Sequence, residues 1–378
     1  MTSDASQKTA AAQQSFYALL QMDARGLWGC IHKTPMVKEK VRFGAAMVVR
    51  SLLLVAFAIL FISVLSGIFG QANSGLVVAG FCILLGIRFV PYGYRAADSV
   101  VALGLVLAIM VLGGVVSLLE NPVISVVANF FFATAILVLV ANDPPMGNAG
   151  LYIFGYLFVS QTPVMGNELI SRSILAVVLW IICGGVLVFK HKGKFRDIRL
   201  HDLVKDFSLK NPTTLWQLRL AAGVAGVLLV GQLMQIPRGV WLGYACMSVL
   251  LPYQAERGST LKRGLSRFGG VAIGSVLFAL VAWLVPPQYH VLFGPVAGIC
   301  IGFSKYYLVD SILNCFGALL LAESVYGLAG SAALRIWDNL IGVLFALVFT
   351  ALLSFLVDRL KERSVKDRPA EHREVIKP

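Results

Sequence analysis

Residues 98–142 read DSVVALGLVLAIMVLGGVVSLLENPVISVVANFFFATAILVLVAN, and this stretch decides the class of fold. Between its first and last residues it holds one charged residue, Glu120, which with the following asparagine and proline separates two apolar blocks. Each block has about the length of roughly 20 residues that a helix needs to cross a bilayer. Neither block alternates polar and apolar residues as a barrel strand does. Because lipid offers the backbone no hydrogen bonds, the two blocks predict two transmembrane helices.

The rest of the chain has the same character. Hydrophobic residues make up 58% of it and charged residues 13%, and the mean hydropathy is +0.81. A soluble protein keeps about a quarter of its residues charged. We therefore expect an all-α polytopic membrane protein with about twelve transmembrane helices. The expected spans are 43–67, 74–91, 98–119, 122–141, 148–163, 170–190, 217–235, 238–253, 268–286, 289–304, 309–328 and 332–357.

Lysine and arginine are distributed unevenly among the loops. They gather in the linker 191–216, between Arg257 and Arg267, and in the tail 359–378, whereas the loops on the opposite side hold almost none. Basic loops stay in the cytoplasm, so this bias predicts that both termini are cytoplasmic, as an even number of spans requires. The net charge of +13 has the same origin. We therefore expect membrane lipids, and no nucleic acid, as partners of the basic segments.

The spans fall into two similar halves. We divide the chain into a cytoplasmic N-terminal segment (1–42), a first six-helix half (43–190), a basic cytoplasmic linker (191–216), a second six-helix half (217–358) and a charged cytoplasmic tail (359–378). The matching pairs are Val90-Pro91-Tyr92 with Leu251-Pro252-Tyr253, Phe154-Gly155 with Phe316-Gly317, Gln161 with Glu323, and Arg172 with Arg335. Six spans per half give both halves one orientation, which predicts a parallel repeat about an axis along the membrane normal.

Three smaller features complete the chain-wide prediction. Residues 15–27 have the pattern of a short amphipathic helix that lies on the membrane surface. The six cysteines lack CxxC spacing and lie mostly in apolar blocks, so we expect no metal and no cofactor. Trp241, Trp283 and Trp337 stand near span ends, where tryptophan is typical of an interfacial anchor.

One region of the second half resembles a known family. It contains Pro237-Arg238-Gly239-Val240-Trp241, then Leu251-Pro252-Tyr253, then Thr260-Leu261-Lys262-Arg263, then Arg267-Phe268-Gly269-Gly270. This order resembles the fusaric acid resistance family, also called aromatic acid exporters, which has a Pro-x-Gly-x-Trp start to a short helix, a Thr-x-x-Arg loop and an Arg-x-x-Gly start to the next helix.

The resemblance implies a transporter of the bacterial inner membrane that exports organic or aromatic acids as anions. It also implies distant kinship with the plant aluminium-activated malate channels, in which basic residues line an anion path. Larger members of the family carry a soluble domain after each membrane half, and the short linker 191–216 leaves no room for the first of these.

Charged residues inside the spans are the candidates for function, because burying a charge in lipid is expensive. Arg172 and Arg335 begin the last helix of each half at equivalent places. As a symmetric pair they predict an electropositive ring that binds a carboxylate through the planar guanidinium group. The alternative is that each arginine anchors a helix end to lipid phosphates.

Two carboxylates are candidates for proton coupling. Asp338 lies one helical turn after Arg335, where it either neutralises that arginine or releases it when an anion arrives. Glu323 matches the uncharged Gln161 of the first half, so one charge breaks the symmetry. It is either a proton acceptor on the outer side or an interfacial residue that faces water.

Two basic residues complete the candidate anion path. Arg50 lies two helical turns inside the first span, deep enough for either an anion contact or a side chain that extends back to the interface. Lys305, beside Tyr306 and Tyr307, is either an ordinary loop charge or part of an inner anion-binding vestibule.

These observations predict a transporter that exports a small anionic substrate, with proton coupling open. An uncoupled anion channel and a structural membrane partner without transport are the alternatives, and the sequence leaves a homodimer open. An enzyme is the poorest interpretation, because HxxxxD, DxxD and HExxH are absent and the five histidines are scattered.

Overall fold

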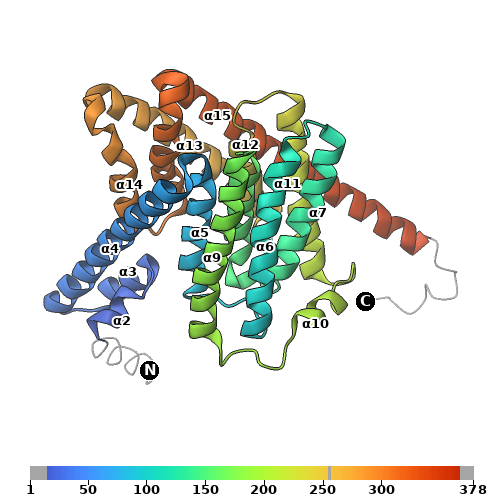
Figure 1. Cartoon of the computed structure of the whole chain (residues 1–378), viewed down its shortest axis with the longest axis horizontal. Helices are drawn as coiled ribbons and strands as arrows, with labels where there is room; N and C mark the ends of the chain where they lie inside the picture. The colour runs from blue at the N-terminus through green and yellow to red at the C-terminus, as the bar shows by residue number, and fades with distance from the viewer. Residues whose placement is uncertain (1–14, 254–256, 367–378) are drawn as a thin grey trace.

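The structure is a computed structural model that describes residues 15–253 and 257–366, and in that part of the chain the regular structure is helical throughout (Figure 1). Two short helices, α2 (Phe16–Leu20) and α3 (Ala24–Lys33), precede the first half. The first half contains α4 (Val37–Phe69), α5 (Ser74–Ile87), α6 (Ala96–Ser117), α7 (Pro122–Val140), α8 (Asn148–Ser160) and α9 (Asn167–His191).

The second half follows a linker that holds α10 (Leu200–Lys205). It contains α11 (Pro212–Leu233), α12 (Gly239–Leu250), α13 (Arg257–Leu284), α14 (Phe293–Ile301) and α15 (Tyr307–Lys366). Short 3₁₀ turns over Gln71–Asn73, Pro144–Met146 and Pro287–Leu292 lead into α5, α8 and α14.

Several helix starts follow directly from the sequence. In Asn121-Pro122 and Asn211-Pro212, the asparagine side chain caps the helix by accepting a hydrogen bond from the backbone N–H two residues later. The proline fits the first helical position, where its missing N–H costs nothing. The same dipeptide therefore begins α7 in the first half and α11 in the second.

Seven of the described helices are long and apolar enough to cross a membrane by themselves: α4, α6, α7, α9, α11, α13 and α15. This confirms a polytopic helical membrane protein. Each of the twelve expected spans overlaps one of the helices above, but α5, α8, α12 and α14 are short, and α15 takes in two expected spans. The number twelve therefore stays a prediction.

The two expected spans inside α15 meet at Gly327. This residue has φ 69° and ψ 175°, a backbone conformation that is open almost only to glycine. The two arms of α15 run in different directions on either side of it (Figure 1). The chain thus changes direction at a single residue, and the sequence around it, Tyr326-Gly327-Leu328-Ala329, carries no strong signal for a loop.

Short helices α5, α8 and α12 lie inside the bundle rather than at its surface. Most residues of each are buried, and their side chains belong to a large apolar core that also takes in α6, α7, α9 and α11. A short helix leaves irregular backbone at membrane depth, which is tolerated only where protein covers it. The burial of these three helices is consistent with that requirement.

A second, smaller apolar core lies between α12, α13 and α15, built around Trp241, Phe278 and Leu319. Glycines allow the helices there to approach closely. A Cβ atom on Gly274 would lie 2.6 Å from the backbone oxygen of Ile312, and one on Gly342 would lie 2.6 Å from that of Leu242. Within this part of the molecule α13 and α14 both pack against α15.

The contacts between the halves follow a pattern that a repeat would produce. In the predicted repeat α4 corresponds to α11, and α7 corresponds to α14. The structure packs α7 of the first half on α11 of the second, and α14 of the second half on α4 of the first. This reciprocal pairing supports the two-fold repeat, which remains a prediction.

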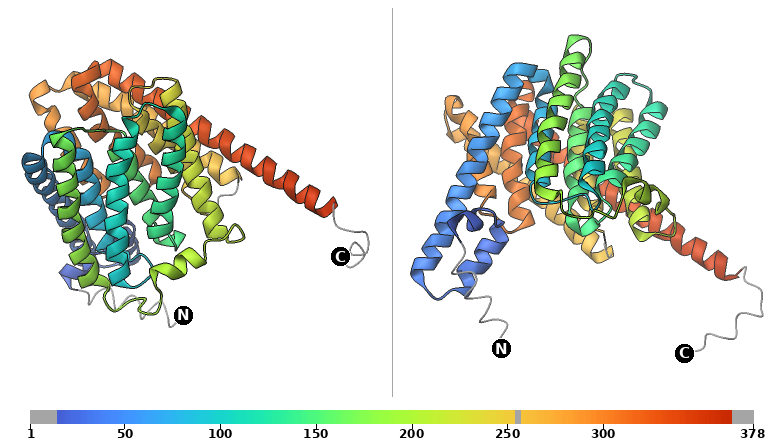
Figure 2. Two further views of the ribbon diagram at one scale, coloured as in Figure 1. Left: turned by 45° about the vertical axis from the view of Figure 1, so that its right-hand side comes forward. Right: turned by 60° about the horizontal axis from the view of Figure 1, so that its bottom comes forward.

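The N-terminal segment differs from the single amphipathic helix expected over residues 15–27. The chain forms two helices: the first ends at Leu20, and Asp23 caps the second by accepting a hydrogen bond from Gly26 N–H at 2.9 Å. Both helices pack on α4, and the Trp28 indole donates to the Phe303 carbonyl at 2.8 Å. The segment therefore links the start of the first half to the α14–α15 loop (Figure 2).

Candidate functional site

The most unusual charged group in the chain is Arg335, in the second arm of α15. Only 4% of it is exposed, and its Cζ atom lies 4.6 Å from the centre of the Trp241 ring on α12. A guanidinium group over an indole face is attracted by the ring quadrupole. Trp241 is itself only 3% exposed, so the expectation that it anchors the protein at the interface is wrong.

Arg335 belongs to a cluster of buried polar atoms that have no hydrogen-bond partner among the described residues. These atoms are Nε and Nη1 of Arg335, Oδ2 of Asp338 and Oδ1 of Asn339. Asp338 and Asn339 lie about one helical turn after Arg335 on the same face of α15, and all three residues are buried. Burying an unpaired polar atom costs free energy, and most native structures contain few such atoms. Four on one helix face therefore point to a polar ligand or water.

Groups from neighbouring helices complete this cluster, which we call the Arg335 cluster. Arg267 on α13 and Tyr244 on α12 interact electrostatically with Arg335, and Arg267 Nε and the Tyr244 hydroxyl also lack a partner in the described part of the chain. Cys315, on the first arm of α15, lies close to the Arg335 guanidinium. Tyr244 packs against both apolar cores, so the Arg335 cluster lies at their junction.

A second arginine lies beside this cluster, at the start of α12. Arg238, the residue before α12, lies over the Trp241 ring at 5.2 Å and over the Tyr326 ring at 5.5 Å. Its Nη2 atom donates to the Leu321 carbonyl at 3.4 Å. Trp241 thus contacts two guanidinium groups, and Arg238 reaches α15 on both sides of Glu323.

Glu323 pairs with a histidine that sequence reasoning did not single out. His290 Nδ1 lies 3.1 Å from Oε1 of Glu323 and 3.3 Å from Oε2. His290 Nε2 lies 3.1 Å from the Ala282 carbonyl and 3.0 Å from the Val285 carbonyl, and the ring stacks on Phe293. The imidazole is therefore held between backbone acceptors and a carboxylate.

The hydrogen bonds of this pair depend on which ring nitrogens carry hydrogen. Backbone carbonyls only accept hydrogen bonds, so a hydrogen on Nε2 of His290 is placed to donate to the Ala282 and Val285 carbonyls. A hydrogen between Nδ1 and the Glu323 carboxyl would join the two side chains.

Arg172, the predicted partner of Arg335, has a different environment. Its Nε donates to Oδ1 of Asn73 at 2.8 Å, its Nη1 to the Thr162 carbonyl at 2.7 Å, and its Nη2 to the Ala72 carbonyl at 2.8 Å. The residue is 1% exposed. All three nitrogens thus bind protein oxygens, and the side chain joins the starts of α5 and α9 to the end of α8.

The surroundings of the two arginines differ in sequence as well. Three residues after Arg335 stands Asp338, whereas three residues after Arg172 stands the fully buried Leu175. Trp241 stands eleven residues before Pro252, whereas Gly80 stands eleven residues before Pro91, in contact with Leu179 of α9. In the first half apolar side chains occupy the positions that carry the polar cluster in the second.

The two other predicted path residues lie apart from the Arg335 cluster. Arg50 lines a cavity between α2, α4, α5 and α9. Lys305 lies in the α14–α15 loop, with Nζ 5.4 Å from the Trp28 ring and 5.1 Å from the Tyr306 ring. Its neighbour Tyr307 lies instead under the guanidinium of Arg263, at 4.5 Å. Of the predicted site residues, Arg335 and Asp338 lie together, and Glu323 lies on the first arm of the same helix.

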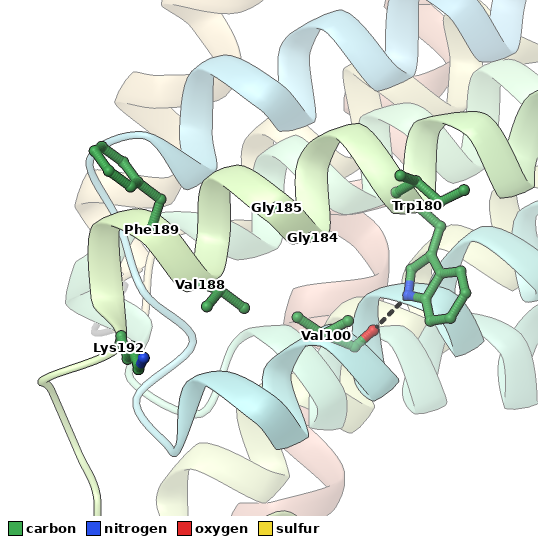
Figure 3. A pocket seen from close by; sticks show the side chains of 8 residues that line it. Val100, Trp180, Gly184, Gly185, Val188, Phe189 and Lys192 are labelled. Carbon is green, nitrogen blue, oxygen red and sulfur yellow. Dashed lines mark hydrogen bonds between the residues drawn. The ribbon is translucent and has the colours of Figure 1, made fainter.

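Three cavities border the first half. One of about 620 Å³ runs between α6 and α9, where Trp180 donates from its indole to the Val100 carbonyl at 2.8 Å (Figure 3). Its lining is apolar apart from this indole and Lys192. A second, of about 410 Å³, continues along the same two helices, and the third contains Arg50. Arg335 and Arg172 line none of these three, so the Arg335 cluster is closed off from them.

Comparison with known families agrees with the resemblance seen in the sequence. Residues 224–349 match the family model described as fusaric acid resistance protein-like. This segment extends from α11 into the second arm of α15, and it contains Trp241, His290, Glu323, Arg335 and Asp338. A search of curated proteins and a search of solved structures each gave no match.

Proposed function

We propose that this protein is a membrane exporter of organic or aromatic carboxylate anions, and that Arg335 binds the carboxylate during transport. The family match and the apolar helices support membrane transport of this general type. The observation that carries the finer proposal is the buried Arg335 guanidinium, which has two nitrogens without a protein acceptor among the described residues and an indole ring beside it.

The chemistry of the Arg335 cluster suits an aromatic acid. A guanidinium group binds a carboxylate through two parallel hydrogen bonds, and such charge-assisted bonds are about twice as strong as neutral ones. Trp241 and Tyr244 supply aromatic surface next to it, which suits the ring of the substrate. The same arrangement disfavours cations, because Arg267 and Arg238 add further positive charge.

Asp338 supplies a means of release. It interacts electrostatically with both Arg335 and Arg238, and one of its oxygens has no partner in the described part of the chain. An ionised Asp338 competes with a substrate carboxylate for the arginines, whereas a protonated one does not. Proton movement onto and off Asp338 would therefore alternate the site between binding and release.

The His290–Glu323 pair is the proposed entry point for that proton. It lies on the side that the distribution of lysine and arginine predicts to be outside, and we place one exchangeable proton between His290 Nδ1 and the Glu323 carboxyl, whose Oε1 lies 3.1 Å away. Loss of this proton leaves a neutral imidazole beside a carboxylate and changes the charge of the pair by one. Arg238 contacts α15 on both sides of Glu323, so it is placed to respond to that change.

For Arg172 we propose a structural role instead of the ring-forming role expected from symmetry. Its three nitrogens are all used by protein oxygens, so binding a substrate carboxylate would first require breaking them. The cost of such a buried, charge-assisted set is several kcal/mol in order of magnitude.

The test is anion flux in vesicles that contain the purified protein. Benzoate and other aromatic carboxylates are loaded on one side, and release is followed with and without a pH gradient. The proposal expects release that a pH gradient accelerates, and that Arg335→Gln reduces while the surface variant Lys262→Gln does not. An anion flux that is the same with and without the pH gradient would favour an uncoupled channel. The absence of flux under both conditions would refute transport of these anions.

A further inference from the structure

The cavity that contains Arg50 has two kinds of wall. Its volume is about 540 Å³, within the range of sites that bind small molecules. Its basic residues are Arg50 of α4, Arg88 at the end of α5, and Lys190 at the end of α9. Its other described lining residues include Tyr17 and Leu20 of α2, Leu53 and Phe57 of α4, Phe89 and Phe189. Apart from the tyrosine hydroxyl these other residues are apolar, and within the described part of the chain the lining contains no acidic residue.

The three basic residues gather at one end of the bundle. Arg88 follows the last residue of α5, and Lys190 lies in the last turn of α9, so both stand where these two helices end. Arg50 comes from α4, which runs upward past α2 and α3 from that same end (Figure 2). The distribution of basic loops predicts that this end faces the cytoplasm. The cations therefore lie near the predicted level of the inner-leaflet headgroups.

The apolar wall is open to the surrounding membrane. Leu53, Phe89 and Phe189 are all exposed, Phe189 by 83%. The guanidinium of Arg88 lies 5.3 Å from the Phe89 ring, and Nζ of Lys190 lies 5.5 Å from the Phe189 ring. Each cation thus stands beside an exposed ring, an arrangement that combines positive charge with apolar surface at one rim.

Electrostatic interactions within the protein explain part of the placement of these three cations. Cations at the ends of α5 and α9 favour the negative ends of the helix dipoles, and Asp23 interacts electrostatically with Arg50. These effects do not explain why the cations share a cavity whose other side is apolar and open to lipid. Asp23 supplies one negative charge beside the three cations, so the described part of the cavity is positive.

We propose that this cavity binds an anionic diacyl phospholipid of the inner leaflet. The phosphate group contacts Arg50, Arg88 and Lys190, and one acyl chain lies along Leu53, Phe57 and the other apolar side chains of the wall. Because α2 supplies Tyr17 and Leu20 to the same cavity, a bound lipid also fastens the N-terminal helices to the first half. The site is independent of the Arg335 cluster, since α12, α13 and α15 contribute no residue to its lining.

The test measures lipid binding directly. Purified protein in detergent is titrated with phosphatidylglycerol or with phosphatidylcholine, and native mass spectrometry counts the lipids that remain bound. Basic residues near an anionic headgroup attract it, so we expect the variant R50Q/R88Q/K190Q to bind phosphatidylglycerol about a hundredfold more weakly. Its affinity for phosphatidylcholine should stay the same.

A matched control keeps the result specific. The variant K194Q/R196Q/K205Q removes three exposed charges from the linker on the same side and should bind phosphatidylglycerol as the unchanged protein does. If the first triple variant fails to fold, Arg88→Gln alone should still weaken phosphatidylglycerol binding about fivefold. Equal loss in both triple variants, or displacement of the lipid by millimolar glycerol phosphate, would overturn the proposal, the latter because it would make the site one for small anions.

Discussion

Arg172 and Arg335 occupy equivalent places in the two halves, yet their surroundings are opposite. Arg172 gives all three guanidinium nitrogens to Asn73 and to two backbone carbonyls. Arg335 has two nitrogens with no acceptor in the described part of the chain, and its nearest ring is Trp241. The same residue type therefore joins helices in one half, and in the other it leaves two nitrogens without a protein acceptor in the described part of the chain.

The difference indicates that the two similar halves have different roles. The first half fills the region around its arginine with Leu175 and other apolar side chains, and it shares one large core with α11 and α12. The second half has a smaller separate core and places Asp338, Asn339 and Tyr244 around its arginine. We infer that the first half serves as the scaffold and the second half carries the site.

The largest effect is expected on the free energy of unfolding when Arg172 is replaced. Arg172→Gln removes three hydrogen bonds donated by a buried, charged side chain, which are worth about 1.5 to 3 kcal/mol each. We expect a loss of about 4 kcal/mol of unfolding free energy, allowing for partial replacement by the glutamine amide. Thermal or denaturant unfolding of the purified protein in detergent measures it.

The same variant separates scaffold from site. Flux per folded molecule should remain within about threefold of the unchanged protein, a difference of less than 1 kcal/mol. A variant as stable as the unchanged protein but unable to transport would contradict the division of work and return Arg172 to the anion path.

The second prediction concerns Arg335. Arg335→Gln removes the charge that binds the carboxylate but no hydrogen bond from Nε or Nη1 to the protein. We expect anion flux at low substrate concentration to fall about a hundredfold, which corresponds to about 2.7 kcal/mol. Unfolding free energy should change little, because Nε and Nη1 have no protein acceptor in the described part of the chain and Asp338 keeps Arg238 as a nearby positive charge.

Two matched variants sharpen this result. Arg335→Lys keeps the charge but loses the planar fork, so it should recover only part of the flux. The exposed control Lys262→Gln should leave flux unchanged. Loss of stability without loss of flux in Arg335→Gln would show that this arginine is the structural one.

The sequence predicted most of the helical architecture and only part of the site. The helices could be placed because apolar blocks of membrane-spanning length are rare outside membrane helices, and Arg335, Asp338 and Glu323 stood out as charges within them. The expected spans 309–328 and 332–357 placed their break beside Gly327, where the structure changes direction.

What the sequence could not provide were contacts made by the folded backbone. The acceptors of Arg172 include the Thr162 and Ala72 carbonyls, and a carbonyl leaves no trace in the identity of its residue. His290 was missed because its partners are Glu323 and two backbone carbonyls. These come together only when the 3₁₀ turn Pro287–Leu292 folds against its neighbours. Trp241 was misplaced because its nearness to a span end suggested lipid contact.

A smaller effect is expected at the turn between the last two segments of each half. The first half turns through residues 161–166, whereas the second turns at Gly327 alone. No other atom lies within 4 Å of a Cβ added at Gly327, so Gly327→Ala acts only through its positive φ, at a cost of about 1 to 2 kcal/mol in unfolding free energy. Gly330→Ala, in a helical stretch of the same arm, is the control and should stabilise or leave the protein unchanged. Equal effects of the two would place no strain at Gly327.

The smallest change in rate, and the most specific, is expected at Glu323. Glu323→Gln gives the second half the amide that Gln161 provides in the first, and it replaces an ionisable partner of His290 with a neutral one. Flux down a substrate gradient at equal pH should stay within about twofold, because Arg335 is untouched. The acceleration by a pH gradient should disappear, since the pair no longer exchanges the shared proton. His290→Gln should have the same consequence, and an undiminished response to the pH gradient in both variants would remove the pair from coupling and leave Asp338 as the remaining proton site.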